Sequence, residues 1–331
     1  MPRFFTFVLA VGFATSLPPS APPALSGVLL VANKGDQTLG LIDPNSYRQV
    51  ATVHETGVTG HEVAASPDGK TAFVPIYGNS GVGLPGTDGS TIDVIDIAQR
   101  KLVRTIDFGH GVRPHCAVFN PEDGLLYVTT EIDKSIAIID PKNMKIVGAI
   151  PTGAPDSHML AISSDGRRGY TANVGPGTVS VLDLAAHKTL SVIAVAKHIQ
   201  RIALTPDGRW AFTSDTEKPR MAVIDTAAGK VDRWITLPAA GYGAAATPDG
   251  KWLLVAIPDA GAVAVINLAT MKVSKNVPVP EGPQEVLVRP DGKFAYVSCS
   301  KPHRVAAIQL DDWNVKVIDA GPGADGLAWA Q

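Results

Sequence analysis

Three of the eight histidines stand at equivalent places in an internal repeat. His61, His115 and His158 each lie eight or nine positions before the glycine of an Asp-Gly pair. Imidazole is the commonest protein ligand for zinc, copper and iron, and three imidazoles around an open coordination position form a known catalytic metal site. The spacing therefore predicts a transition-metal site if the fold gathers these residues. The alternative is three polar residues that bind water and loop backbone.

The Asp-Gly pairs define the repeat that must position these histidines. Their glycines are residues 69, 124, 166, 208, 250 and 292. The first interval between successive glycines is therefore longer than the four that follow, which are equal to one another. Each unit contains four short runs rich in Val, Ile, Tyr and Thr, bounded by turn residues. A period of about 40 to 50 residues built from such strands is typical of β-propeller blades.

We therefore expect an all-β fold, a seven-bladed propeller with four antiparallel strands in each blade. The strands between residues 28 and 53 lack an inner strand before them, and the segment 325–330 lacks outer strands after it. The two chain ends are expected to share one blade and close the ring, which leaves no open sheet edge. Residues 27–331 then form a single domain.

The repeat also assigns residues to the two ends of the propeller, which we call the turn face (with the Asp-Gly turns) and the loop face. Seven histidines map to the loop face, and only His187 maps to the turn face. The residues that open the innermost strands should ring the mouth of the central channel on the loop face. An additional metal ligand, or a residue that orients one, is expected from Glu62, Cys116, Asp156, Gln200 or Asp325. Candidate metal ligands are His61, His115 and His158, and candidate ligand-binding residues are Gln200, Arg201, Tyr242, Gln284, Asp325 and His303.

An insertion at residues 77–89 accounts for the one long step of the repeat and belongs to the loop face. Insertions on a repeat scaffold often mark the binding face, so the segment is predicted to be a lid or a partner contact, or else a tolerated surface insertion. It contains five glycines but no following Lys-Ser or Lys-Thr pair, which excludes a phosphate-binding loop and a nucleotide cofactor.

Composition excludes further classes of function. The net charge is −2, the pI is about 6.4 and no run of Lys or Arg occurs, which argues against nucleic acid as a partner. No Cys-x-x-Cys-His motif is present, which argues against c-type haem. The two cysteines, Cys116 and Cys299, fall in distant blades and are expected to be free, buried thiols.

Residues 1–26 have the pattern of an export signal followed by a Pro-rich lead-in. Arg3 precedes an apolar stretch at residues 4–15 that is too short to span a bilayer comfortably, and small residues after it offer cleavage points. An uncleaved anchor is the alternative. No later segment is apolar enough to cross a membrane, so the mature chain is predicted to be a periplasmic or secreted monomer.

Sequence motifs within the strands resemble those of a known family. Tyr127-Val128-Thr129-Thr130, Ala295-Tyr296-Val297-Ser298 and Val31-Ala32-Asn33 recur at the repeat spacing, and over residues 27–331 the chain resembles the YVTN-repeat propellers, which include surface-layer and YncE-like exported proteins. The resemblance implies the propeller fold but no particular activity, because such propellers serve many roles.

A second resemblance, carried by a Pro-His pair and the turn after it, indicates a hydrolytic activity. Pro114-His115 with the turn at residues 120–124 resembles the Pro-His and Pro-Asp-Gly pattern of seven-bladed lactonases, although the Pro-His pair occurs in one blade only and Glu122 lengthens its turn. It implies hydrolysis by a metal-activated water, with an imidazole as general base and an arginine, Arg113 or Arg201, stabilising the oxyanion. The candidate catalytic residues are His115, His158 and Arg113.

Three functions stay open from the sequence. The first is an exported protein that binds a small molecule or a protein at the loop face, with zinc, copper or iron at its histidines. The second is the metal-dependent hydrolase, and the third is a redox or cofactor partner that uses copper at the same cluster.

Overall fold

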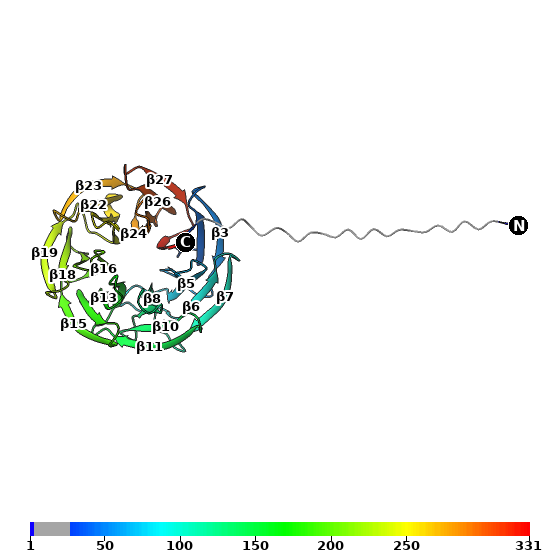
Figure 1. The fold of residues 1–331 in the computed structure, drawn as a ribbon, viewed down its shortest axis with the longest axis horizontal. Coiled ribbons are helices and arrows are strands. Elements are labelled where there is room, and N and C mark those ends of the chain that lie inside the picture. Colours follow the sequence, from blue (N-terminus) through cyan, green and yellow to red (C-terminus); the bar gives the residue numbers. More distant parts are fainter. Residues whose placement is uncertain (3–26) are drawn as a thin grey trace.

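The computed structural model describes residues 1, 2 and 27–331. Within these residues, seven four-stranded antiparallel sheets stand around a central axis as the blades of a propeller (Figure 1). The predicted all-β fold is therefore confirmed. The export signal and the Pro-rich lead-in were predicted for residues 1–26, of which 3–26 lie outside the described residues. A single 3-10 turn, Pro258–Ala260, is the helical element of the described chain.

The strands follow the ring in chain order, and each blade is given from its innermost to its outermost strand. Blade 1 contains β28 (Ala324–Ala330), β1 (Val28–Asn33), β2 (Thr38–Asp43) and β3 (Arg48–His54). Blade 2 contains β4 (Ala64–Ala65), β5 (Thr71–Gly78), β6 (Asp88–Asp96) and β7 (Lys101–Asp107). Blade 3 contains β8 (Pro114–Phe119), β9 (Leu126–Thr130), β10 (Ser135–Asp140) and β11 (Lys145–Pro151). Blade 4 contains β12 (Ser157–Ile162), β13 (Arg168–Asn173), β14 (Thr178–Asp183) and β15 (Lys188–Ala194).

The remaining three blades repeat the pattern. Blade 5 contains β16 (Ile199–Leu204), β17 (Trp210–Asp215), β18 (Arg220–Asp225) and β19 (Lys230–Thr236). Blade 6 contains β20 (Ala244–Ala246), β21 (Trp252–Ile257), β22 (Ala262–Asn267) and β23 (Lys272–Pro278). Blade 7 contains β24 (Pro283–Val288), β25 (Phe294–Cys299), β26 (Arg304–Gln309) and β27 (Val315–Asp319).

Blade 1 closes the ring from both ends of the chain, as predicted. The C-terminal strand β28 pairs antiparallel with β1, and Leu29 lies opposite Trp329 in the register. Because the last strand of the chain is the inner strand of the first blade, opening the ring requires breaking this ladder. Gly326 in β28 packs so closely on blade 2 that an added Cβ would lie 2.5 Å from the carbonyl oxygen of His61.

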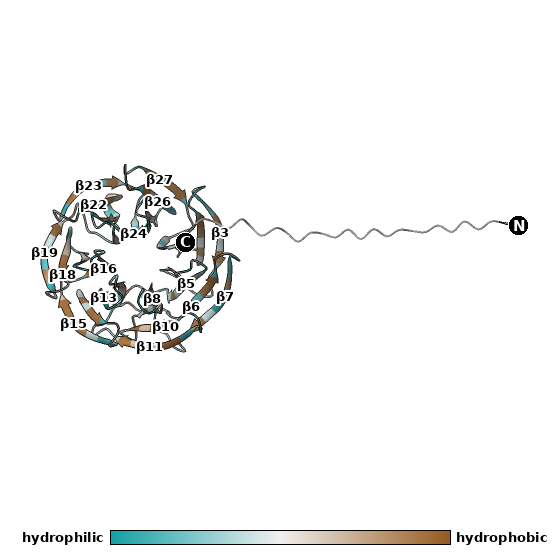
Figure 2. Cartoon of the chain, viewed as in Figure 1, coloured by the Kyte–Doolittle hydropathy of each residue, from teal (hydrophilic) through white to brown (hydrophobic). Residues whose placement is uncertain are grey.

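Burial explains why the strands differ in composition across each blade. The two middle strands are covered on both faces by the neighbouring blades, so β9 and β21 are buried along almost their whole length. The outermost strands alternate instead, as in the exposed and half-buried residues of β3. Figure 2 shows this alternation as brown and teal stretches along the outer ring. Burial on both faces favours continuous apolar runs, and burial on one face favours alternation.

The recurrent aspartates at the end of the third strand in blades 1 to 5 cap turns. Asp43 accepts a hydrogen bond from the backbone N–H of Asn45 at 3.0 Å, and Asp140 accepts one from that of Lys142 at 2.9 Å. An aspartate two residues before a backbone N–H forms this turn without help from the rest of the fold. The same role falls to Asp96, Asp183, Asp225 and Asn267.

The inner strands are irregular where they meet the loop face. The register shifts by one residue between Pro114 and Ala117 in β8, and similar shifts occur near the start of β12, β16 and β24. A β-bulge of this kind re-aims side chains and leaves backbone groups outside the ladder. Hydroxyl groups pair with them: the Thr129 Oγ1 accepts from the Cys116 N–H at 2.9 Å, and the Ser298 Oγ accepts from the Glu285 N–H at 3.0 Å.

The two cysteines are free and buried, which confirms the prediction. Burial raises the pKa of the Cys299 thiol to about 12. In the part of the chain that the structure describes, no helix has the length and apolarity that a bilayer crossing needs.

One buried carboxyl group makes the stability of the fold depend on pH. Glu55 accepts hydrogen bonds from the Gly60 N–H at 2.6 Å and the Thr59 hydroxyl at 3.3 Å, and burial raises its pKa to about 7. The folded chain then binds more protons than the unfolded chain between about pH 4.5 and pH 7, so stability falls as the pH rises through this interval. We expect Glu55→Gln to raise the free energy of unfolding at pH 8 by about 1–2 kcal/mol and to flatten its pH dependence.

Urea denaturation at pH 5 and pH 8 measures this effect, with Glu122→Gln, an exposed carboxyl group, as the matched control. Equal pH slopes for wild type and Glu55→Gln would contradict it.

Candidate functional site

The structure places the three candidate histidines together at the loop-face end of the channel. His115 and His158 are the second residues of β8 and β12, and His61 precedes the short strand β4. The ring centroids of His61 and His115 are 5.4 Å apart, and those of His115 and His158 are 3.5 Å apart. His115 and His158 are buried, whereas His61 is half-buried.

All three imidazoles are held in the neutral form. Burial lowers the pKa of His61 to about 3, with Lys34 as the largest electrostatic contribution. Burial also lowers the pKa of His115 far below its usual range, and His158 and His61 add to the effect. For His158, burial lowers the pKa and prevails over the opposing influence of Glu131. Neutral imidazole is the form that ligates metals.

Two of these rings carry a nitrogen without a partner. The Nδ1 atoms of His115 and His158 are buried and have no hydrogen-bond partner among the residues that the structure describes. Glu131 Oε2 lies 3.8 Å from His158 Nδ1. Buried polar groups without partners are uncommon and costly, and they call for an explanation in terms of a bound species or of function.

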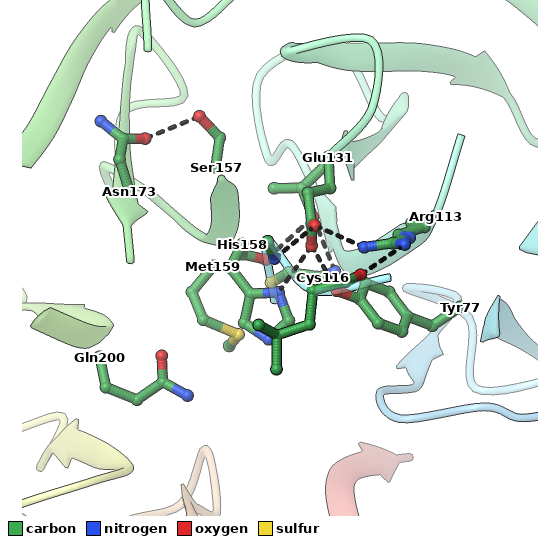
Figure 3. Close-up of polar contacts among 12 residues, drawn as sticks. Tyr77, Arg113, Cys116, Glu131, Ser157, His158, Met159, Asn173 and Gln200 are labelled. Carbon is green, nitrogen blue, oxygen red and sulfur yellow. Dashed lines mark hydrogen bonds and ion pairs between the residues drawn. The ribbon is translucent and has the colours of Figure 1, made fainter. Parts of the chain in front are cut away.

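Glu131 connects His158 to the surrounding loops (Figure 3). Its carboxylate accepts hydrogen bonds from the Tyr77 hydroxyl, from the Gly83 N–H at 2.9 Å and from Arg113 Nη1 at 3.0 Å. Burial acts to raise the pKa of Glu131, but the interactions with His158, Tyr77 and Gly83 outweigh it and lower the pKa to about 2. The group is therefore a buried carboxylate anion beside three neutral imidazoles.

Tyr77 lies against all three histidines. Its ring centroid is 4.8 Å from that of His61, 5.2 Å from that of His115 and 5.6 Å from that of His158. Burial and the bond to Glu131 raise the pKa of its hydroxyl far above the usual value, so it stays a hydrogen-bond donor. The packing of Tyr77 limits how far the imidazoles are able to turn.

The insertion lies beside this cluster and is fastened to it. The predicted loop 77–89 is shorter in the structure, because β5 continues to Gly78 and β6 begins at Asp88. Arg113 donates from Nε to Asp88 at 2.6 Å and from Nη2 to the Leu84 carbonyl oxygen at 2.8 Å. Since Nη1 binds Glu131, each guanidinium nitrogen of Arg113 has a partner, and the oxyanion-stabilising role predicted for Arg113 would require breaking these contacts.

The other predicted residues are divided between the channel and its rim. Arg201 and Asp325 form an ion pair in the channel, and Gln200 Nε2 donates to the Tyr242 hydroxyl at 2.8 Å. Gln284 is half-buried, and its carbonyl oxygen accepts from the Gly243 N–H at 3.0 Å. His303 does not join the three histidines: it is exposed in the turn between β25 and β26, where its Nδ1 accepts from the Gly323 N–H at 3.2 Å.

The cluster is not preassembled around a metal position. Among the described residues no three His, Cys, Asp or Glu side chains are arranged to hold a metal ion. Imidazoles that share one ion, with bonds of about 2.1 Å, splay apart from it, whereas the rings of His115 and His158 lie against each other, with centroids 3.5 Å apart and planes tilted by 32°. These two rings would have to separate before they ligated the same ion.

Sequence reasoning missed Tyr77 and Glu131. The repeat assigns Tyr77 to the insertion, and Glu131 directly follows the Tyr-Val-Thr-Thr motif in a loop, where a carboxylate is normally solvated. The available signal was the long first interval of the repeat, because the longer loop reaches blade 3, where the Gly83 N–H donates to Glu131.

Comparisons with known proteins support the fold. No family model matches the chain, and no curated protein matches it. Among solved structures, a chain of Kuenenia stuttgartiensis hydrazine synthase is similar, with a TM-score of 0.68 and 19% sequence identity over 81% of this chain and 89% of that chain. At this identity the likeness shows the fold alone, and membership of the YVTN-repeat family stays a prediction.

Proposed function

We propose that the protein is a binding protein that takes up a divalent transition metal at the channel mouth, with His61, His115 and His158 as ligands. The propeller fold supports a binding or scaffold role. The proposal of a metal site rests on the contact of three neutral imidazoles, two of which have a buried Nδ1 atom without a hydrogen-bond partner. A bound cation would be the missing partner of His115 Nδ1, and by holding the ring of His158 through its other nitrogen it would leave His158 Nδ1 to donate a hydrogen bond to Glu131.

The surroundings favour zinc, copper or iron over harder cations. Imidazole nitrogen suits these three metals, whereas calcium and magnesium prefer oxygen ligands. Glu131 Oε2 lies 3.8 Å from His158 Nδ1, so a small turn of the ring would let this nitrogen donate a hydrogen bond to the carboxylate while the other ring nitrogen binds the metal. Such carboxylate partners fix the orientation of ligating histidines.

Metal analysis of the purified chain tests the proposal. After exposure to zinc, copper(II) or iron(II) and removal of free metal, we expect about one equivalent of one of these metals per chain, and its loss in His115→Ala/His158→Ala. His187→Ala is the matched control, because His187 lies in a turn on the opposite face. A chain that binds none of the three metals, or a double variant that binds as wild type does, would overturn the proposal.

We also propose that the chain is exported, on the pattern of residues 1–26 and on its resemblance to exported YVTN-repeat proteins. Expression of the full-length chain with a C-terminal tag, followed by cell fractionation, tests this. Recovery in the cytoplasmic fraction alone, at full length, would contradict it.

A further inference from the structure

A second cluster of polar side chains lies in the channel, on residues at or directly after the positions that open the innermost strands. Arg201 stands at its centre, and we call Arg201 with Glu62, Glu285 and Asp325 the Arg201 cluster. Arg201 Nη1 lies 2.8 Å from Glu62 Oε1 and also pairs with Glu285, while Nη2 lies 3.4 Å from Asp325 Oδ1. One side chain of blade 5 thus reaches carboxylates of blades 1, 2 and 7.

The charges of the Arg201 cluster do not balance. Three carboxyl groups surround one buried guanidinium. The neighbouring cation is Lys34, whose side chain is 37% exposed and whose ammonium lies 3.1 Å from Asp325 Oδ2. Buried acidic groups in excess of their cations either take up protons or attract further positive charge, and a cation with N–H donors that enters the cluster would take the place of those protons.

The same region has more free acceptors than donors. Within the described chain, Glu62 Oε1 and Gln200 Oε1 are buried without a hydrogen-bond partner, as is one donor, Arg201 Nε. Glu62 Oε1 belongs to the ion pair with Arg201 but does not accept a hydrogen bond in it. Gln200 is 8% exposed, and Figure 3 shows its amide extending from its strand toward the middle of the channel. A species that fits must bring N–H or O–H donors.

We propose that the Arg201 cluster binds the ammonium group of a small primary amine. An ammonium brings one positive charge and three donors, which is what the carboxylates and the Gln200 oxygen require. Lys34 already places a primary ammonium on Asp325 at the edge of the cluster. Tyr242, whose ring lies 5.2 Å from the Arg201 guanidinium carbon, offers an aromatic surface to a cation or to its alkyl chain.

A metal ion fits this cluster less well. Hard cations need several oxygen ligands at about 2.0–2.6 Å from one point, and among the described residues the carboxylates are not arranged in that way. They point instead at a guanidinium, which is itself a nitrogen cation with N–H donors. The proposal is independent of the metal at the three histidines.

Calorimetric titration of the full chain, treated with a chelator, tests the proposal with n-butylammonium chloride at constant ionic strength. Tetramethylammonium, a cation without N–H donors, and n-butanol, a neutral chain of equal length, are the matched probes. We expect saturable binding of n-butylammonium and none of the other two. Equal binding of tetramethylammonium, or of magnesium or calcium chloride, would overturn the assignment to a primary ammonium, as would no binding of n-butylammonium to any variant.

Two variants locate the site. Lys34→Met removes the competing ammonium from Asp325, so the affinity for n-butylammonium should rise about five- to tenfold. Gln200→Leu should lower it about tenfold, because the free acceptor is lost. Lys301→Met, at an exposed loop lysine, should leave it unchanged. Affinity that neither Lys34→Met nor Gln200→Leu alters would overturn the proposal, and Lys34→Met, at a partly exposed position, keeps the test decisive if Gln200→Leu fails to fold.

Discussion

Replacing Arg201 by methionine should destabilise the folded chain by about 3–5 kcal/mol. The guanidinium is buried and is paired with Glu62, Glu285 and Asp325, so its removal leaves three acidic groups close together in the channel. Methionine fills much of the volume of the arginine stem. The loss of stability therefore measures the effect of removing the charge and not that of creating a cavity. Denaturant-induced unfolding followed by tryptophan fluorescence measures the change.

A triple variant separates charge from shape at this cluster. Adding Glu62→Gln and Glu285→Gln to Arg201→Met should restore a substantial part of the stability, because the uncompensated acidic groups are then removed. Burial already raises the pKa of Glu62 and of Glu285, and Arg201 only partly opposes it. Arg304→Met, at a partly exposed arginine paired with Asp319 on the rim, is the control that should show no measurable loss. A similar loss of stability in Arg304→Met and Arg201→Met would show that the Arg201 cluster contributes no more to stability than an ion pair on the rim does.

Replacing Glu131 by glutamine should weaken metal binding at the channel mouth about 10- to 100-fold. The carboxylate is the buried anion beside His158, and an amide keeps its shape but loses its charge and one of its acceptor oxygens. The same change should lower the free energy of unfolding by about 1–3 kcal/mol, because Tyr77, Gly83 and Arg113 all donate to this group. Metal competition against a coloured chelator gives the affinity, and thermal unfolding gives the stability.

Tyr77→Phe is the matched variant for this prediction. It removes one donor to Glu131 and leaves the carboxylate, Arg113 and Gly83 in place. We expect a small loss of stability and less than about a threefold change in metal affinity. If Glu131→Gln loses stability but binds metal as tightly as wild type does, Glu131 anchors the insertion and does not orient His158.

The regularity of the repeat made the fold predictable. The Asp-Gly turns and the capping aspartates act locally, through bonds between residues two or three positions apart, so their spacing carries the blade pattern without knowledge of the rest of the chain. The ends of elements were predicted less accurately: the insertion expected at residues 77–89 keeps part of its length in β5 and β6. Ends of strands depend on which backbone groups find partners in neighbouring strands.

The repeat pattern alone was sufficient to predict the propeller, its closure and the convergence of His61, His115 and His158, because a closed repeat carries equivalent positions to one axis. The close contact of the His115 and His158 rings, the buried anion at Glu131 and the reach of Arg201 across the channel emerged only from the folded chain. These features depend on β-bulges and on an insertion that bring side chains of different blades into contact. Such contacts are set by distances across the channel, which a period along the chain does not contain.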